Sequence, residues 1–360
     1  MNVDYQSPDT LIELVHQWLS ALENLGQAVR ILFLDFRKAF DHVDHHILLK
    51  KLANSGVPDF LTRWVTAFLC ERQQRVKIGD KYSQWSSVRA GVPQGTLLGP
   101  TSFLLHINDL QTECKTIKYV DDASIWAVCN RDGTDDTLQL AADQAIQWSM
   151  NNNMVINTEK TKEMTIYYGK KPLTVGNVMM DGTKIETVTC IKVLGVVINN
   201  KLTWHDHVQY ITTRASSRLY FLRMLKRVGI SLTDIFHVYT SIIRPILEYA
   251  CEVWHPGLSK ELSQSLEHVQ KRALKIMLPD ASYSKALEHF SCETLHQRRE
   301  YLCKKLFKNI CNPSHRLNYL LPPIRNNVKG LRNCTEYALP KTRTLRFKNS
   351  PINYCLFNFQ

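Results

Sequence analysis

Residues 116–128, TIKYVDDASIWAV, decide the fold of the chain around them. Two short apolar runs, 116–120 and 123–128, are joined by Asp121 and Asp122, a pattern that predicts a tight β-hairpin. Adjacent carboxylates repel each other unless a cation neutralises them. We therefore expect a cation site at this hairpin, while a polar turn without further function is the alternative interpretation.

A third carboxylate stands at the end of another predicted strand. Residues 29–36, VRILFLDF, form a continuous apolar run with Asp35 near its end, as expected for a buried strand. Three carboxylates on rigid strand ends can hold two Mg²⁺ ions about 4 Å apart, the arrangement used for in-line phosphoryl displacement. A single Asp after a strand is commonplace, so this prediction depends on both features together.

The periodicity of apolar residues predicts an α+β body followed by an all-helical region, with the boundary near residue 202. The predicted strands are 29–36, 75–78, 87–88, 116–120, 123–128, 162–168, 178–180 and 192–198. The predicted helices are 10–25, 46–69 with an interruption near 56–58, 101–110, 136–151, 208–228, 232–253, 261–277, 285–290 and 295–310. From residue 312 the chain is rich in Pro, Asn and Arg, and we expect it to be loosely packed.

Charge is divided along the chain in the same way. The 360 residues carry a net charge of +12, of which residues 1–202 contribute −1 and residues 203–360 contribute +13. This division indicates a catalytic body joined to a region that binds a polyanion; a merely solvating basic surface is the alternative. The longest stretch without charge, 90–108, contains three Gly and two Pro, so we expect no membrane span and no membrane partner.

Five segments resemble, in order, the motifs of reverse transcriptases from non-LTR (LINE-type) retrotransposons, with the strongest similarity to Jockey/CR1-like elements. They are LDFRKAFDHVDH (34–45), GVPQGTLLGP (91–100), YVDD (119–122), NTEKTK (157–162), and LGVVI (194–198) followed by LTW (202–204). The similarity continues through residues 244–249, Trp254 and residues 344–350, and so covers nearly the whole chain. Many relatives have Phe-Ala-Asp-Asp where this chain has Tyr-Val-Asp-Asp, which keeps the aromatic residue and both carboxylates.

The resemblance implies the α+β fold of a right-hand polymerase. Residues 1–202 would form the palm, an antiparallel sheet with helices, and residues 203–311 an all-α basic thumb. Residues 312–360 would form a loosely structured tail. Asp35 comes so early that the fingers would be largely missing, and Arg30 is the only basic residue among the first 34. We therefore expect an N-terminally truncated chain with weakened nucleotide binding, because the fingers of the family clamp the triphosphate.

The resemblance also assigns roles to individual residues. Asp35, Asp121 and Asp122 would be the catalytic residues that hold two Mg²⁺ ions, and Lys160 would protonate the leaving pyrophosphate. Lys162 is the competing lysine, and either could be an ordinary surface residue. The nucleotide-binding residues would be Phe40, Gln94 and Gly95. Phe40 would exclude a ribose 2′-OH, with an ordinary core Phe as the alternative.

The predicted function is RNA-directed DNA polymerase, acting on an RNA template, a DNA primer and a dNTP. A catalytically inactive remnant that only binds nucleic acid is the alternative, and a phosphodiesterase is a weaker one. Contacts to the nucleic-acid backbone would come from Arg214, Arg218, Arg223, Lys226 and Arg227, with solvated helix faces as the alternative. We expect no zinc, because the Cys and His residues between 292 and 315 lack the spacing of a zinc finger.

Overall fold

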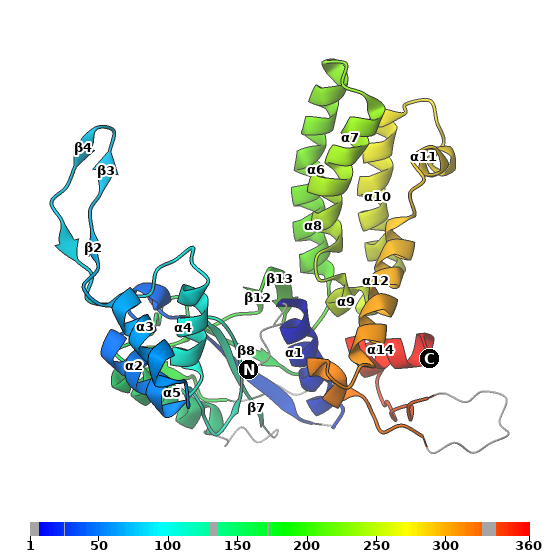
Figure 1. Ribbon diagram of the computed structural model, residues 1–360. Helices are drawn as coiled ribbons and strands as arrows, with labels where there is room; N and C mark the ends of the chain where they lie inside the picture. The colour runs from blue at the N-terminus through cyan, green and yellow to red at the C-terminus, as the bar shows by residue number, and fades with distance from the viewer. Residues whose placement is uncertain (1–6, 25, 130–135, 171–172, 174, 326–335) are drawn as a thin grey trace. The chain divides into compact units, whose positions relative to one another are not determined.

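The computed structural model describes residues 7–24, 26–129, 136–170, 173, 175–325 and 336–360. The chain divides into two compact units, whose elements are labelled in Figure 1. The first, here called the sheet unit, comprises residues 27–165 and 169–188. The second, here called the helical unit, comprises residues 1–26, 166–168 and 189–360.

A five-stranded sheet with the order β11-β8-β1-β7-β6 forms the centre of the sheet unit. Both β1 and β6 run antiparallel to β7, and β11 runs parallel to β8. The strands are β1 (Ala28–Leu34), β6 (Lys115–Tyr119), β7 (Asp122–Cys129), β8 (Lys162–Ile166) and β11 (Glu186–Thr187). The predicted hairpin at 116–128 is therefore present as β6 and β7.

Strand β1 is buried along its whole length, although it carries a charge. The Arg30 guanidinium donates hydrogen bonds from Nε and Nη2 to Glu163 Oε1 on β8, at 2.9 and 2.6 Å. Its Nη2 also donates to the carbonyl of Gly176 at 2.6 Å. Separation of the two strands would leave both buried charges without a partner, which is costly. This ion pair therefore holds β1 beside β8.

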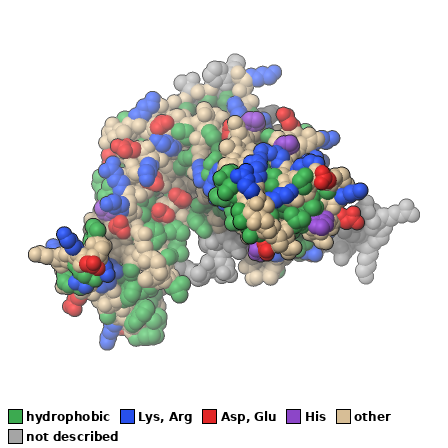
Figure 2. All heavy atoms as spheres, turned by 90° about the horizontal axis from the view of Figure 1, so that it is seen from above, with side chains coloured by type: hydrophobic (Ala, Val, Ile, Leu, Met, Phe, Trp, Pro, Cys, Tyr) green, Lys and Arg blue, Asp and Glu red, His purple; other side chains and the backbone are tan. Residues whose placement is uncertain are grey.

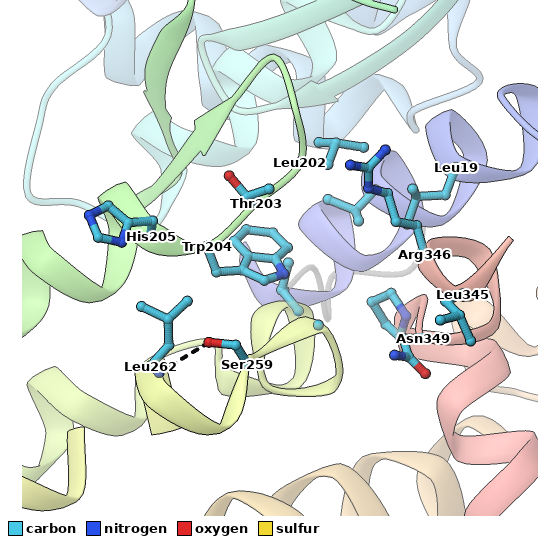
Figure 3. A pocket seen from close by; sticks show the side chains of 14 residues that line it. Leu19, Leu202, Thr203, Trp204, His205, Ser259, Leu262, Leu345, Arg346 and Asn349 are labelled. Carbon is cyan, nitrogen blue, oxygen red and sulfur yellow. Dashed lines mark hydrogen bonds between the residues drawn. The ribbon is translucent and has the colours of Figure 1, made fainter. Parts of the chain in front are cut away.

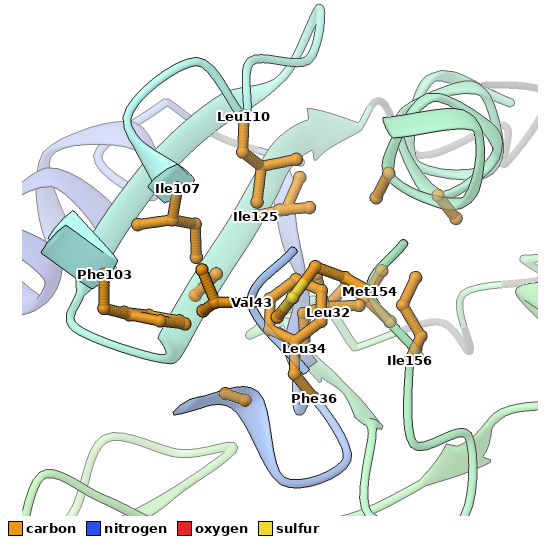
Figure 4. Close-up of a cluster of buried hydrophobic side chains, with 14 of the residues drawn as sticks. Leu32, Leu34, Phe36, Val43, Phe103, Ile107, Leu110, Ile125, Met154 and Ile156 are labelled. Carbon is orange, nitrogen blue, oxygen red and sulfur yellow. The ribbon is translucent and has the colours of Figure 1, made fainter. Parts of the chain in front are cut away.

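One hydrophobic core supports the elements that carry the site residues (Figure 4). Leu34 from β1, Ile125 from β7 and Phe103 from the helix α4 (Leu98–Ile107) meet in it, and each is at most 2% exposed. Burial of each such side chain contributes roughly 1.5–3 kcal/mol. The other elements of the sheet unit are η1 (Ala39–Asp41), α2 (His45–Asn54), α3 (Asp59–Leu69), α4 (Leu98–Ile107), α5 (Thr137–Asn151), β2 (Gln73–Gln74), β3 (Lys77–Ile78), β4 (Lys81–Tyr82), β5 (Ser86–Ser87), β9 (Met179–Met180) and β10 (Thr183–Lys184).

The helical unit is built around the long helices α6 (His205–Arg227) and α10 (Lys260–Met277). On α6 the buried residues Ile211, Ala215, Leu219 and Leu222 recur every three or four positions, which is the spacing of one helix face. The other elements are α1 (Ser7–Ala21), β12 (Cys190–Val193), β13 (Val196–Asn199), α7 (Leu232–Val238), η2 (Tyr239–Ile243), α8 (Arg244–Glu248), α9 (Cys251–Trp254), η3 (His255–Gly257), α11 (Tyr283–His289), α12 (Leu295–Ile310), η4 (Arg316–Leu320), α13 (Leu345–Lys348) and α14 (Pro351–Asn358).

The predicted fold class, an α+β body followed by helices, is confirmed, but two elements differ in detail. The single strand expected over 192–198 is instead the antiparallel hairpin of β12 and β13, with Leu194 and Gly195 in its turn, and one expected helix is divided. The single helix expected over 232–253 is divided into α7, the π-helical turn η2, α8 and α9. Pro245 lacks the N–H that a continuous helix requires, and Ala250 adopts a left-handed conformation with φ 49°. These two residues account for the division.

The two compact units do not coincide with the expected ranges 1–202, 203–311 and 312–360. Helix α1 belongs to the helical unit, and in the expected tail α14 buries Ile352, Cys355 and Leu356. Residues 326–335 of that tail lie outside the described residues. The assignment of palm, thumb and tail describes function and stays a prediction.

No helix in the described part of the chain is both long enough and apolar enough to cross a membrane.

Candidate active site

The strand register brings the predicted carboxylates to one edge of the sheet. Leu34 faces Ala123 across the antiparallel pair β1–β7, so the next step of the register places Asp35 beside Asp122. Asp122 also pairs with Tyr119 on β6, and Asp121 lies in the turn between them. Asp35 and Asp121 are half-buried, whereas Asp122 is exposed.

The hairpin turn lies one residue earlier than the sequence predicts. Its two residues are Val120 and Asp121, and Asp122 already belongs to β7. Val120 has a positive φ of 55°, which costs an L-residue about 1–2 kcal/mol. Its side chain packs against the core, which helps to hold this strained turn and therefore the direction of both carboxylates.

The negative charges of Asp35, Asp121 and Asp122 act on one another at this edge. Desolvation raises the pKa of Asp122, and the negative charges of Asp121 and Asp35 raise it further. A cation at this edge would relieve that repulsion, and carboxylate oxygens are the ligands that Mg²⁺ prefers. As the side chains stand, no group of three or more Asp, Glu, His or Cys residues in the described ranges is arranged to hold a metal ion.

Asp35 is positioned through its backbone by the segment 155–161. Its N–H donates to Thr161 Oγ1 at 3.2 Å, and its carbonyl accepts from the Asn157 N–H at 2.8 Å. An isolated bridge between Phe36 and Ile156 continues this contact. Thr161 is fully buried. The sequence motif identifies Lys160 as a candidate site residue. It does not indicate that the neighbouring Thr161 contacts Asp35.

The structure distinguishes the two candidate lysines by their contacts. Lys162 donates from Nζ to the Glu159 carbonyl and forms an ion pair of 2.6 Å with Glu186. Lys160 is exposed, lies in the turn closed by Asn157, and its ammonium has no partner among the described residues. Lys160 is thus the lysine with an uncommitted ammonium group, and it lies within the segment 155–161 that holds Asp35.

The half-buried Phe40 is fixed between two of the sequence motifs. Its ring stacks on Phe103 of α4, with centroids 4.7 Å apart, and its carbonyl accepts from the Val92 N–H at 2.9 Å. Gly91 has a φ of 87°, and a Cβ there would lie 2.9 Å from the Asp41 carbonyl oxygen. The two motifs therefore approach each other at a point where only glycine fits.

Gln94 and Gly95 lie beyond this contact, on the exposed part of the same loop. Gln94 Nε2 is 3.4 Å from Asp41 Oδ1, and its side chain is exposed. Gly95 has a φ of 81° but no atom within 4 Å of where a Cβ would stand. At the loop's end, a Cβ on Gly99 would lie 2.2 Å from the Pro93 carbonyl oxygen, so Gly99 closes the loop onto α4. The contact between Gln94 and Asp41 adds to the join between the two motifs.

The five predicted backbone-contacting cations lie on α6 in the helical unit. Lys226 donates to the carbonyls of Ile276 and Met277 at 2.7 and 3.1 Å, so it completes the end of α10. Arg218 donates to the Ile242 carbonyl at 3.2 Å, and Arg214 to the Tyr210 hydroxyl at 2.9 Å. The two remaining cations, Arg223 and Arg227, are exposed and have no partner in the described chain. Figure 2 shows Lys and Arg side chains gathered among hydrophobic ones on the face that it views.

A cavity of about 350 Å³ in the helical unit lies beside Trp204 (Figure 3). The Trp204 indole packs against Gly257, where a Cβ would lie 2.5 Å from Nε1. Ser259 caps α10 by accepting from the Leu262 N–H. The lining residues include neither a carboxylate nor a thiol. This cavity therefore lacks the paired acids that the edge of β1 and β7 provides.

Comparisons with known proteins identify the family of the chain. Residues 3–198 match the family described as reverse transcriptase (RNA-dependent DNA polymerase). The RNA-directed DNA polymerase from the mobile element jockey of Drosophila melanogaster is 30% identical over 276 residues, which are 73% of this chain and 30% of that protein. A probable RNA-directed DNA polymerase from the transposon X-element of the same organism is 25% identical over 280 residues, 75% of this chain and 30% of its own length.

Among solved structures, a telomerase from Candida tropicalis in complex with a fragment of telomeric RNA aligns with 88% of this chain and 53% of its own. The sequence identity is 12% and the TM-score 0.45. The chain spans 30% of the length of the two curated relatives. The predicted resemblance to non-LTR retrotransposon polymerases is confirmed by the family match and by these relatives. The chain belongs to the reverse transcriptase (RNA-dependent DNA polymerase) family.

Proposed function

We propose that this chain is an RNA-directed DNA polymerase that adds deoxynucleotides to a primer 3′-OH. The observation that carries the proposal is that the β1–β7 register ends at the pair Leu34–Ala123, so that Asp35 and Asp122 are the next residues at this edge and Asp121 precedes Asp122 in the turn. Membership of the family supplies the reaction class, and the sheet edge supplies the acidic groups that such a reaction needs.

The three carboxylates Asp35, Asp121 and Asp122 would hold two Mg²⁺ ions. Desolvation is the main cause of the raised pKa of Asp122, and the negative charges of Asp121 and Asp35, which a bound cation would neutralise, add to it in support of this assignment. When bound, such ions activate an attacking hydroxyl and neutralise a leaving pyrophosphate. The strained turn at Val120 and the backbone contacts of Asp35 would keep the carboxylates in place before the substrate arrives.

The incoming deoxynucleotide would lie against Phe40, Gln94 and Gly95. Phe40 is supported from behind by Phe103, so its ring can exclude a ribose 2′-OH without yielding. Gln94 is exposed and can donate from its amide, and the open space around Gly95 would let the backbone approach the nucleotide closely. The loop contact at Gly91 couples these groups to one another.

Lys160 would act on the leaving pyrophosphate. Its ammonium is exposed and uncommitted, whereas Lys162 is paired with Glu186. A protonated amine beside a developing phosphate charge stabilises the transition state and can transfer its proton to the leaving group.

The RNA template and DNA primer would be held in part by cations of α6, foremost Arg223 and Arg227, which have no partner in the described chain.

Extension of a DNA primer annealed to an RNA template, followed by sequencing of the product, tests this proposal. The chain should copy the template with dNTPs and discriminate against NTPs, and Phe40→Ala should reduce that discrimination. Asp121→Asn should abolish extension. Asp143→Asn is the matched control, because Asp143 is an exposed carboxylate of α5 that accepts a hydrogen bond from the Gln139 side-chain amide, as an Asn could also do.

A folded sample that binds the primer–template duplex but never extends the primer would contradict the proposal. That outcome would favour the alternative of a chain that only binds nucleic acid. Extension that survives Asp121→Asn would contradict the assignment of the carboxylates while leaving the reaction class in place.

A further inference from the structure

A two-stranded ribbon, residues 73–87, projects from the sheet unit between α3 and the loop that carries Gln94 (Figure 1). In it β2 pairs with β5 and β3 with β4, and Gly79 and Asp80 form the turn, with φ 57° at Gly79. Every residue from 73 to 87 is exposed. Because an isolated two-stranded ribbon is only marginally stable in water, such complete exposure points to a partner.

A β-bulge gives the ribbon one specialised face. Gln74 pairs with Ser86 and Lys77 with Tyr82, so two residues on one strand oppose three on the other. Without the extra residue, Tyr82 and Trp85 would point to opposite faces, because side chains alternate along a strand. With it, both rings contact Arg75, whose guanidinium lies 4.1 Å from the Tyr82 ring centre and 4.6 Å from that of Trp85.

We call Arg75, Lys77, Tyr82 and Trp85 the basic–aromatic face of the ribbon. The Lys77 ammonium lies 5.3 Å from the Tyr82 ring centre, which places it on this face as well. Tyr82 is 50% exposed and Trp85 58% exposed, although they contact Arg75. The opposite face presents Val76 and Ile78, which are 62% and 76% exposed, together with Lys81.

The base of the ribbon is tied to the candidate active site. Arg72 donates from Nη2 to the Gly91 carbonyl at 3.0 Å, and the same carbonyl contacts His45 Nε2 at 2.8 Å. Val88 donates its N–H to the Arg72 carbonyl at 2.8 Å. The base of the ribbon is therefore hydrogen-bonded to the loop in which Gln94 stands.

We propose that the basic–aromatic face binds single-stranded RNA, in the form of the template strand outside the primer duplex. Bases would stack on Tyr82 and Trp85, and phosphates would pair with Arg75 and Lys77. Exposed aromatic rings interleaved with cations are the usual platform for unpaired bases, whereas paired bases hide their faces. The choice of RNA rests on the proposed function, in which the template is RNA.

Binding of a fluorescein-labelled 20-nucleotide oligouridylate to the full chain, followed by fluorescence anisotropy, tests this proposal. The pair Tyr82→Ser with Trp85→Ser should raise Kd by about tenfold or more. The pair Val76→Ser with Ile78→Ser removes equally exposed apolar side chains from the opposite face and should leave Kd unchanged. All four residues are exposed, so neither pair touches the core.

The salt dependence of binding separates the two faces a second time. Lys77→Ala should reduce the slope of log K against log salt by about 0.7, as expected for the loss of one phosphate contact on a single strand. Lys81→Ala removes the same charge from the opposite face and should not change the slope. In photocrosslinking with 4-thiouridine, the crosslink should fall in the tryptic peptide of residues 82–89.

Equal effects from both faces, or no effect from either, would overturn the proposal. A change of oligomeric state with unchanged RNA affinity in the Tyr82/Trp85 variant would show a protein contact instead. The result is independent of catalysis. Ribbon variants that extend a primer and bind RNA like the wild-type chain would overturn only this inference. If the Tyr82/Trp85 variant binds RNA more weakly than the wild-type chain but the wild-type chain itself does not extend a primer, only the proposed polymerase activity is contradicted.

Discussion

Both backbone groups of Asp35, its N–H and its carbonyl, are hydrogen-bonded. These bonds fix the position of the residue, whereas its carboxylate has no side-chain partner among the described contacts. The buried hydroxyl of Thr161 accepts from the Asp35 N–H, and Asn157 donates to the Asp35 carbonyl. Precise placement of catalytic groups usually depends on such supporting hydrogen bonds. Thr161 is therefore a positioning residue for the proposed metal site.

Thr161→Val should lower the rate of primer extension, because it removes the acceptor of the Asp35 N–H while keeping the shape of the side chain. The unsatisfied N–H should also destabilise the fold by about 1–3 kcal/mol. Thr161→Ser keeps the hydroxyl and should restore most of the rate. Rates measured at saturating nucleotide, alongside urea denaturation midpoints, check both effects. A Val variant with wild-type kcat would show that the hydroxyl has no positioning role.

Asp122 should make the folded state less stable as the pH rises above the acidic range. Its pKa in the folded chain is raised above the ordinary 3.8, so the folded state holds this proton more tightly than the unfolded state does. The resulting stabilisation is present below pH 3.8 and is lost as the pH rises through the raised pKa. Asp122→Asn should therefore raise the thermal midpoint at pH 7 and not at pH 3, and Asp143→Asn should change it at neither. A midpoint lowered by Asp122→Asn at pH 7 would contradict this account.

At the scale of elements, the join between the first two motifs depends on the absence of a side chain at Gly91. Gly91→Ala would add a Cβ 2.9 Å from the Asp41 carbonyl oxygen at a φ of 87°. It should destabilise the fold by about 1–3 kcal/mol and raise KM for the dNTP, because the loop must move away from Phe40. Gly176→Ala is the matched control, since no atom lies within 4 Å of its Cβ position. Unchanged KM and stability in Gly91→Ala would show that the contact between Gly91 and the Asp41 backbone is not tight.

The sequence predicts these elements well where a local pattern determines them. The hairpin of β6 and β7 and the buried strand β1 follow from short apolar runs, and so does the edge that they share. The position of the turn was wrong by one residue, because Val120 takes a backbone conformation that a β-branched residue rarely adopts. The division of the helix expected at 232–253 was missed because apolar periodicity continues across Pro245 and Ala250.

Contacts between distant segments could not be predicted from the pattern alone. Nothing local to Arg30 announces that it pairs with Glu163, and nothing local to Thr161 announces Asp35. In the sequence, Arg30 stands out only as the single Lys or Arg among the first 34 residues. Its burial in an ion pair makes it unavailable to a triphosphate, a conclusion that requires the sheet order.

At the scale of the whole molecule, the +13 charge of residues 203–360 should appear in the salt dependence of binding. Arg223→Ala with Arg227→Ala should reduce the slope of log K against log salt for an RNA–DNA duplex by up to about 1.8, or about 0.9 for each lost phosphate contact. Lys226→Ala should instead lower the thermal midpoint, because it uncaps α10. A double variant with the wild-type slope would remove α6 from the nucleic-acid interface.

The domain boundary predicted from the sequence differs from the division into compact units. Charge and periodicity both place a boundary near residue 202, yet β12 and β13, which precede it, belong to the helical unit together with α1. Gly195 explains part of this, because a Cβ there would lie 2.8 Å from the Tyr249 ring, and Tyr249 donates to the Leu194 carbonyl at 2.9 Å. Such packing between residues more than 50 positions apart leaves no periodic signal.

The most direct test of the account is the single-turnover rate at which one dNTP is added to a DNA primer on an RNA template by Asp35→Asn. The substitution preserves the backbone hydrogen bonds of residue 35 and changes only one oxygen to an amide. We expect Asp35→Asn to be slower than the wild-type chain by about a thousandfold, since metal-ion stabilisation of a phosphoryl transition state is worth several kcal/mol. Duplex affinity should remain unchanged. A rate within about threefold of wild type would contradict the claim that this carboxylate belongs to the catalytic site.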